Sequence, residues 1–225
     1  MKIFNVAAAA ATIAVMILYI LNGQLLIKGA ASLCFAIMAC VNMIYALRCG
    51  GSDRRFAVFV AVGHVISMGA DVVLNLTFIP GAAMFAAAHV CYIIGYCFHM
   101  RFGMRDVLCT LPFIAFAIIF IKLPIFDFGG MSMEILCIIY GVIISLMVGK
   151  AFSNLTRERC MTNSVLVCGS ILFYFSDMML VADVFSGGSD IADMLCVSTY
   201  YAGQCLIACS IFLATERAKE KKEQV

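Results

Sequence analysis

The sequence predicts an all-α integral membrane protein, built as a bundle of eight transmembrane helices. Of its 225 residues, 64% are hydrophobic and only 12% are charged, whereas a soluble domain carries about 25% charged residues. The apolar runs lack the short alternating pattern of transmembrane β-strands, so we expect helices. Polar breaks between the runs are too short to hold a soluble domain, and the net charge of +2 creates no strong field that would attract nucleic acid.

Eight apolar runs are long enough for helices that cross the bilayer, since about 20 residues span about 30 Å of hydrocarbon. We expect one transmembrane domain over residues 1–225. The predicted spans are residues 3–21, 29–47, 56–78, 81–100, 107–123, 131–149, 164–185 and 194–215. No cleavage site follows the first span, so we expect it to be retained rather than removed as a signal peptide.

The fifth and the eighth spans have features that the other spans lack. The fifth span is short and contains Pro112, and Lys122 at its end can extend its amine to the interface. The eighth is followed by a charged tail, residues 216–225. We expect that tail to be a solvated helix end near anionic headgroups.

The basic residues are distributed unevenly between the two sides of the membrane. If the N-terminus and every second loop face one side, Lys28 and Lys122 are the only two of the 15 basic residues on the other side. The remaining basic residues are Lys2, Arg48, Arg54, Arg55, Arg101, Arg105, Lys150, Arg157, Arg159, Arg217, Lys219, Lys221 and Lys222. This asymmetry predicts that both termini are cytoplasmic. Short loops favour a bacterial plasma (inner) membrane, although a protein of the endoplasmic reticulum would have loops of the same kind.

The 12 cysteines do not indicate a disulfide framework. Most of them lie inside apolar runs, where cysteine behaves as a small hydrophobic residue. No CxxC pair occurs, and no Cys/His cluster has the spacing of a zinc site. We therefore expect no metal site.

Two aspartates lie inside long apolar runs, Asp71 in VGHVISMGADVVLN and Asp177 in LFYFSDMMLVADVF. An ionisable group within the membrane is costly, so it indicates a functional site by default. At 1.5 Å per residue, Asp71 lies roughly 22 Å and Asp177 roughly 20 Å from the cytoplasmic start of its span. Both carboxyls are therefore expected in one slab of the outer half of the bilayer.

A structural interpretation competes with the functional one. Ser67 or Asn75 could satisfy Asp71, and Ser176 or Tyr174 could satisfy Asp177, as intramembrane polar groups usually find partners. However, no Lys or Arg is expected in the same slab. Burial then favours one protonated carboxyl beside an ionised one, which is the arrangement that general acid/base catalysis uses.

Other polar residues are expected at the same depth on the fourth and eighth spans. They are His89, Tyr92, Tyr200, Tyr201 and Gln204. His89 and Tyr92 share one helix face. A lone membrane histidine is equally well explained as a hydrogen-bonded link between helices, so for His89 both interpretations stay open.

A weak internal repeat relates the two halves of the chain. Gly63 precedes Asp71 by the same interval as Gly169 precedes Asp177, and a leucine follows each aspartate at the same distance. Two four-helix halves in parallel orientation would superpose these spans. Such halves commonly place a site within the membrane at their junction.

Four stretches in order resemble the YhhN-type lysoplasmalogenase family of membrane proteins. They are GADVVLN, GAAMFAAAHVCYIIGYCF, GSILFYFSDMMLVADVF and TYYAGQCLIA, and together they cover the third to eighth spans. The sequence departs from the family pattern at Ala70, where the family usually has glycine. Both residues are small.

The resemblance implies an enzyme that hydrolyses the vinyl ether bond of lysoplasmalogens, with no cofactor. The products are a fatty aldehyde and glycerophosphoethanolamine or glycerophosphocholine. By this resemblance one of Asp71 and Asp177 protonates the enol ether, and the other stabilises the cation and activates water, as carboxyl pairs do in glycosidases. The supporting residues, which orient carboxyls, water or substrate, would be His89, Tyr92, Ser176, Tyr200, Tyr201, Gln204 and Asn75.

Two other functions remain open from the residues alone. Intramembrane Asp and His also relay protons in proton-coupled small-molecule transporters, although broken helices are not evident here. A non-catalytic lysolipid-binding membrane protein would use the same residues without cleaving its ligand. In each of the lipid interpretations the partners are a lysophospholipid and the lipids of the bilayer.

Overall fold

The structure is a computed structural model that describes residues 1–50 and 54–223. Within these residues it contains helices and no strand. The helices are α1 (Lys2–Asn22), α2 (Leu25–Cys49), α3 (Arg54–Leu76), α4 (Phe78–His99), α5 (Met104–Ile121), α6 (Met131–Arg157), α7 (Met161–Phe185) and α8 (Asp190–Glu223). All eight are long and apolar enough to cross a membrane, which confirms the predicted fold class. The twelve cysteines are free thiols.

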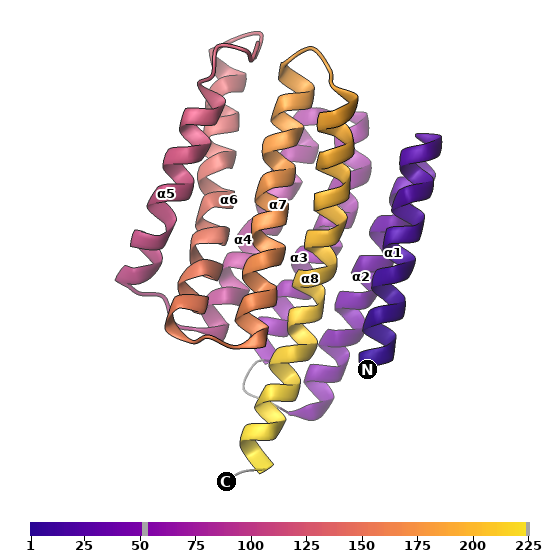
Figure 1. Ribbon diagram of the computed structural model, residues 1–225, viewed down its shortest axis with the longest axis vertical. Helices are drawn as coiled ribbons and strands as arrows, with labels where there is room; N and C mark the ends of the chain where they lie inside the picture. Colours follow the sequence, from indigo (N-terminus) through magenta and orange to yellow (C-terminus); the bar gives the residue numbers. More distant parts are fainter. Residues whose placement is uncertain (51–53, 224–225) are drawn as a thin grey trace.

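Six helices form a closed ring, in which α2, α3, α4, α6, α7 and α8 each contact the next and α8 returns to α2. Helix α3 also contacts α8 across the ring. Helix α1 packs outside the ring on α2 and α8, and α5 packs outside on α6 and α7 (Figure 1). Both chain termini lie at one end of the bundle, which we call the basic end. We call the other end of the bundle the opposite end.

The close approach of α7 and α8 depends on two glycines. A Cβ atom added to Gly169 would lie 2.9 Å from the carbonyl oxygen of Gly203, and one added to Gly203 would lie 2.8 Å from that of Gly169. Real side chains do not tolerate such contacts, so only glycine lets the two backbones touch here. The pair carries Asp177 on α7 and Tyr200 on α8, so this contact helps to position both.

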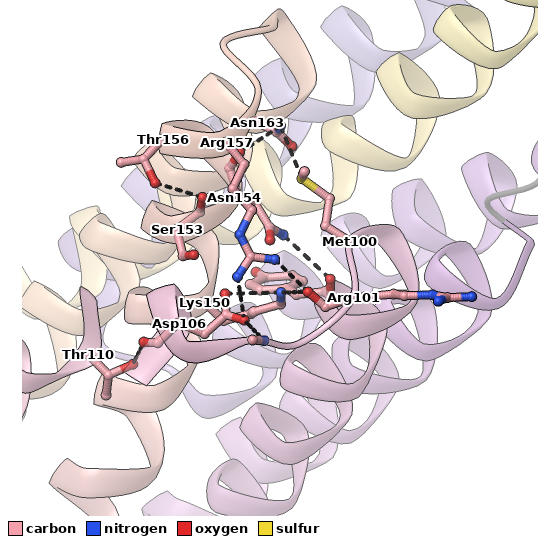
Figure 2. A network of polar contacts seen from close by, with 12 residues as sticks. Met100, Arg101, Asp106, Thr110, Lys150, Ser153, Asn154, Thr156, Arg157 and Asn163 are labelled. Atoms are coloured by element: carbon pink, nitrogen blue, oxygen red, sulfur yellow. Dashed lines mark hydrogen bonds and ion pairs between the residues drawn. The ribbon is translucent and has the colours of Figure 1, made fainter. Parts of the chain in front are cut away.

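At the basic end, a buried ion cluster joins α5 to α6 (Figure 2). Asp106 has a side chain that is only 1% exposed, and it accepts hydrogen bonds from Lys150 Nζ at 3.1 Å and Arg157 Nη2 at 2.9 Å. The helix continues beyond the predicted sixth span to Arg157, and its last turns carry the buried Lys150, whose charge Asp106 neutralises.

Candidate functional site

Asp71 lies on α3 with 3% of its surface exposed. Its Oδ2 atom accepts a hydrogen bond from Ser32 Oγ on α2 at 2.6 Å and another from the Tyr200 hydroxyl on α8 at 2.7 Å. Ser32 Oγ is also 3.0 Å from the Tyr201 hydroxyl. The carboxyl is thus held by donors from two different helices.

Asp177 on α7 is held in a similar way, with 6% of its surface exposed. Its Oδ2 atom accepts a hydrogen bond from the Tyr140 hydroxyl on α6 at 2.7 Å. Nε2 of His89 on α4 lies 3.3 Å from the same oxygen and 2.9 Å from the Tyr140 hydroxyl. When Nε2 carries the proton, His89 donates to both.

Both aspartates line one cavity with a volume of about 50 Å³, which is room for a reacting bond and a few water molecules rather than a whole lipid. Its walls come from α2, α3, α4, α7 and α8. The lining residues are Lys28, Asp71, Leu74, Phe85, Ser176, Asp177, Leu180, Asp193, Cys196, Val197, Tyr200 and Tyr201. Among the described residues, the Oδ1 atom of neither aspartate has a hydrogen-bond partner, so both are available to a ligand.

Lys28 corrects one expectation from the sequence. We expected no cation at the depth of the aspartates, but Lys28 lines the same cavity. Helix α2 begins at Leu25, earlier than predicted, so Lys28 belongs to its first turn instead of a loop. The carboxyl of Asp193, on the first turn of α8, lines the cavity as well.

Of the predicted supporting residues, Ser176, Tyr200 and Tyr201 line the cavity. Tyr92 and Gln204 are buried and do not line it, and the Tyr92 hydroxyl donates to Gln204 Oε1 at 3.0 Å. The structure therefore brings Ser176, Tyr200 and Tyr201 to the cavity of the aspartates, whereas Tyr92 and Gln204 pair with each other outside its lining.

The local partners that the structural interpretation named do not hold the carboxyls. Asn75 donates to the backbone carbonyl of Asp71 at 2.6 Å, and Ser67 pairs with Tyr92. Ser176 pairs with Cys196, and Tyr174 donates to the carbonyl of Phe113. Each aspartate is instead bonded by residues distant in sequence.

Ser32 and Tyr140 are the two direct partners that the sequence interpretation missed. Tyr140 lies nine residues into α6 from the opposite end, and Ser32 seven residues into α2, which places them roughly 13 Å and 10 Å deep. Depth along the span, the signal that indicates His89, therefore also indicates both of these residues.

A metal site is not evident in the described part of the chain, where no group of three or more His, Cys, Asp or Glu side chains could hold an ion. The hydrogen bonds at both aspartates come from hydroxyl groups and one imidazole. This set suits proton transfer and orientation of a neutral or anionic ligand.

Eight helices long and apolar enough to cross a membrane, six of which form a ring around a buried pair of carboxyls, define an integral membrane protein with a buried polar site. The chain belongs to the YhhN family, whose model matches residues 23–211. This match confirms the suspected family. Neither a curated protein nor a solved structure matches the sequence.

Proposed function

We propose that the protein is a membrane hydrolase that cleaves the vinyl ether bond of lysoplasmalogens. The products are a fatty aldehyde and glycerophosphoethanolamine or glycerophosphocholine. Membership of the YhhN family supports the proposal. The observation that carries it is the pair of aspartates, which line one cavity and each keep one carboxyl oxygen unbonded within the described residues.

Hydrolysis of a vinyl ether suits two carboxyls in a restricted space. The slow step is transfer of a proton to the β-carbon of the double bond, which leaves an oxocarbenium ion. Water then adds to this ion, and the resulting hemiacetal collapses to aldehyde and alcohol. A protonated carboxyl supplies the proton, and an ionised one stabilises the cation and accepts a proton from water, as in glycosidases.

The hydrogen-bond donors beside the two aspartates suit these roles of acid and base. Ser32 and Tyr200 hold Asp71, while Tyr140 and His89 hold Asp177, and within the described residues each carboxyl keeps its other oxygen unbonded. Preorganised donors of this kind need little rearrangement during the reaction. Lys28 supplies a positive charge that suits the phosphate of the substrate.

For the location of the protein we propose a bacterial plasma (inner) membrane with both termini in the cytoplasm. The structure places both termini at the basic end, and the positive-inside rule assigns that end to the cytoplasm. The candidate cavity then lies in the outer half of the bilayer. Lysoplasmalogen of the outer leaflet would reach it directly.

The proposal is tested with purified protein, a lysoplasmalogen and its saturated alkyl-ether analogue. We expect aldehyde from the first lipid and none from the second, because a saturated ether cannot accept a proton at carbon. Tight binding of both lipids without aldehyde would instead indicate a lysolipid-binding protein. Proton-coupled flux of a small solute into vesicles, again without aldehyde, would indicate a transporter.

A further inference from the structure

An apolar groove lies on the lipid-facing side of the bundle between α4 and α6. Its volume is about 330 Å³, and it is lined by Ala82, Ala83, Ala86, Ser132, Ile135, Leu136, Ile139, Tyr140 and Ile143. Ile135 is 48% and Ile139 is 57% exposed, so the groove is open to the surrounding hydrocarbon. Small alanines on α4 create the hollow opposite the larger side chains of α6.

A narrow second cavity of about 30 Å³ lies between the groove and the candidate site. That cavity shares Ala82, Leu136 and Tyr140 with the groove. It shares another four residues with the candidate site, namely Leu74, Phe85, Asp177 and Leu180. The three cavities therefore form a row from the groove, past Tyr140 and Asp177, to Asp71 and Lys28.

The two ends of this row of cavities differ in the polarity of the residues that line them. The groove is lined by aliphatic side chains with two hydroxyls, whereas the charged residues Lys28 and Asp193 line the candidate site and not the groove. A lysolipid has the same polarity, with an apolar chain at one end and a phosphate at the other. Its reactive double bond lies between them.

We propose that the substrate's hydrocarbon chain occupies the groove between α4 and α6 while its phosphate lies beside Lys28. This inference rests on the proposed function and adds the direction in which the substrate is bound. The occupant is the chain of a lysolipid, and the alternative occupant, an ordinary bilayer lipid that never enters the inner cavity, is an outcome of the test below.

The direction of binding assigns the two carboxyls. Along the substrate the order is chain, β-carbon, α-carbon, ether oxygen and glycerol. Asp177 lines both the narrow second cavity, on the side of the hydrocarbon chain, and the candidate site. Asp71 lines only the candidate site. Asp177 therefore meets the β-carbon and acts as the acid, and Asp71 meets the α-carbon and acts as the base.

With this assignment both carboxyls return to their starting protonation states after one reaction cycle. Protonated Asp177 gives its proton to the β-carbon, and the ether oxygen donates an electron pair to form the oxocarbenium ion. Ionised Asp71 takes a proton from the water that bonds to the α-carbon. Asp177 then removes the hemiacetal hydroxyl proton while Asp71 protonates the departing glycerol oxygen, which restores both groups.

A lysolipid with a saturated ether and a photoactivatable diazirine at the chain end tests the location of the chain. We expect adducts on residues 82–86 of α4 and 135–143 of α6. Excess unlabelled lysoplasmalogen should reduce the yield of these adducts. Adducts spread evenly over lipid-facing residues, or adducts that the competitor leaves in place, indicate bilayer lipid in the groove and overturn the proposal.

A matched pair of variants on α4 provides the second measurement. Ala86→Leu fills the groove, whereas Ala87→Leu adds the same side chain at an exposed neighbour that does not line it. We expect Ala86→Leu to lower kcat/KM roughly tenfold for a long-chain substrate and little for a short-chain one, while Ala87→Leu matches the wild type. Equal losses of kcat/KM in both variants, or a loss that does not depend on the substrate's chain length, would refute the proposal that the hydrocarbon chain occupies the groove.

The same experiments separate this inference from the proposed function. If the wild type releases no aldehyde, the function fails, and crosslinking of the saturated analogue still reports whether the groove binds a chain. If aldehyde is released but the adducts lie elsewhere, the function stands and the groove assignment fails.

Discussion

Asp71 and Asp177 lie on the wall of one cavity, and each accepts hydrogen bonds at Oδ2 from residues of two other helices. For Asp71 these helices are α2 and α8, and for Asp177 they are α6 and α4. Four helices thus fix the orientation of two carboxyls from α3 and α7. Such rigid placement is what catalysis by paired carboxyls requires.

Replacing either aspartate by asparagine should abolish the reaction. Asp71→Asn and Asp177→Asn keep the shape of the side chain but cannot transfer a proton, so we expect aldehyde release to fall by a factor of about 10² or more. The matched control is Asp190→Asn, which changes an exposed carboxyl at the opposite end. Monodispersity in detergent reports folding. Near wild-type turnover of both site variants would exclude acid/base catalysis by these residues.

Tyr140→Phe should affect catalysis through Asp177, because it keeps the ring that lines the groove and removes the hydroxyl that donates to Asp177 Oδ2 at 2.7 Å. Asp177 becomes charged when it gives up its proton, and a hydrogen bond to a charged group contributes about 1.5–3 kcal/mol. As a positioning residue it should lower kcat roughly tenfold and shift the pH profile of kcat, with little change in KM.

The control for this change is Tyr174→Phe. The Tyr174 hydroxyl donates to the carbonyl of Phe113 at 2.7 Å and touches neither aspartate, so its loss should leave the pH profile of kcat as in the wild type. If both tyrosine variants lose activity to the same extent with unshifted profiles, Tyr140 has only a structural role.

The fold could be predicted from the sequence because hydrophobic run length and basic residue placement are local signals. These signals predict all eight helices, and α8 continues to Glu223 as the helix end expected for the charged tail, but α6 runs beyond its predicted span to Arg157. Asp106 neutralises Lys150 in that extension, and this ion pair joins residues far apart in the chain. A window of hydropathy cannot detect it.

The two aspartates could also be found from sequence, because charge inside an apolar run is conspicuous. Their partners were harder to find. Ser32 and Tyr140 are ordinary residues in a membrane helix, and only the packing of the ring brings them to the carboxyls. Lys28 was placed in a loop, and an earlier start of α2 moves it to the cavity.

The internal repeat stays a prediction, and only the helices that carry the donors can be compared with it. If α1–α4 correspond to α5–α8, then α2, which carries Ser32, corresponds to α6, which carries Tyr140. Likewise α8, which carries Tyr200, corresponds to α4, which carries His89. Each aspartate therefore takes one donor from each of the two related helix positions.

Lys28 should contribute to substrate affinity through the phosphate. Lys28→Gln removes the positive charge of the cavity, so we expect the KM for lysoplasmalogen to rise roughly tenfold, a loss of about 1.4 kcal/mol. The KM for an alkenyl glycerol without phosphate should not change. The control is Lys122→Gln, whose lysine is exposed and paired with Glu134 at 2.6 Å. An equal rise for both substrates would contradict phosphate binding.

Asp106 should matter for stability and not for turnover. Asp106→Asn leaves Lys150 buried without its counter-charge, which costs about 3–5 kcal/mol of unfolding free energy. Glu158→Gln breaks a partly exposed pair with Arg217 at the same end, where about 0–1 kcal/mol is expected. Thermal unfolding in detergent measures both. Activity per folded molecule should stay constant, and a selective loss in Asp106→Asn would connect the ion cluster of Figure 2 to the reaction.

Azide should distinguish the acid from the base. It adds to an oxocarbenium ion without losing a proton, so it replaces water in a variant that lacks the base. In Asp71→Ala, which keeps the acid Asp177, azide should restore consumption of the alkenyl lipid and yield an azido ether, recovering part of the roughly 10²-fold loss. In Asp177→Ala the cation never forms, so azide should have no effect. The opposite pattern would exchange the two roles and place the hydrocarbon chain on the side of Asp71.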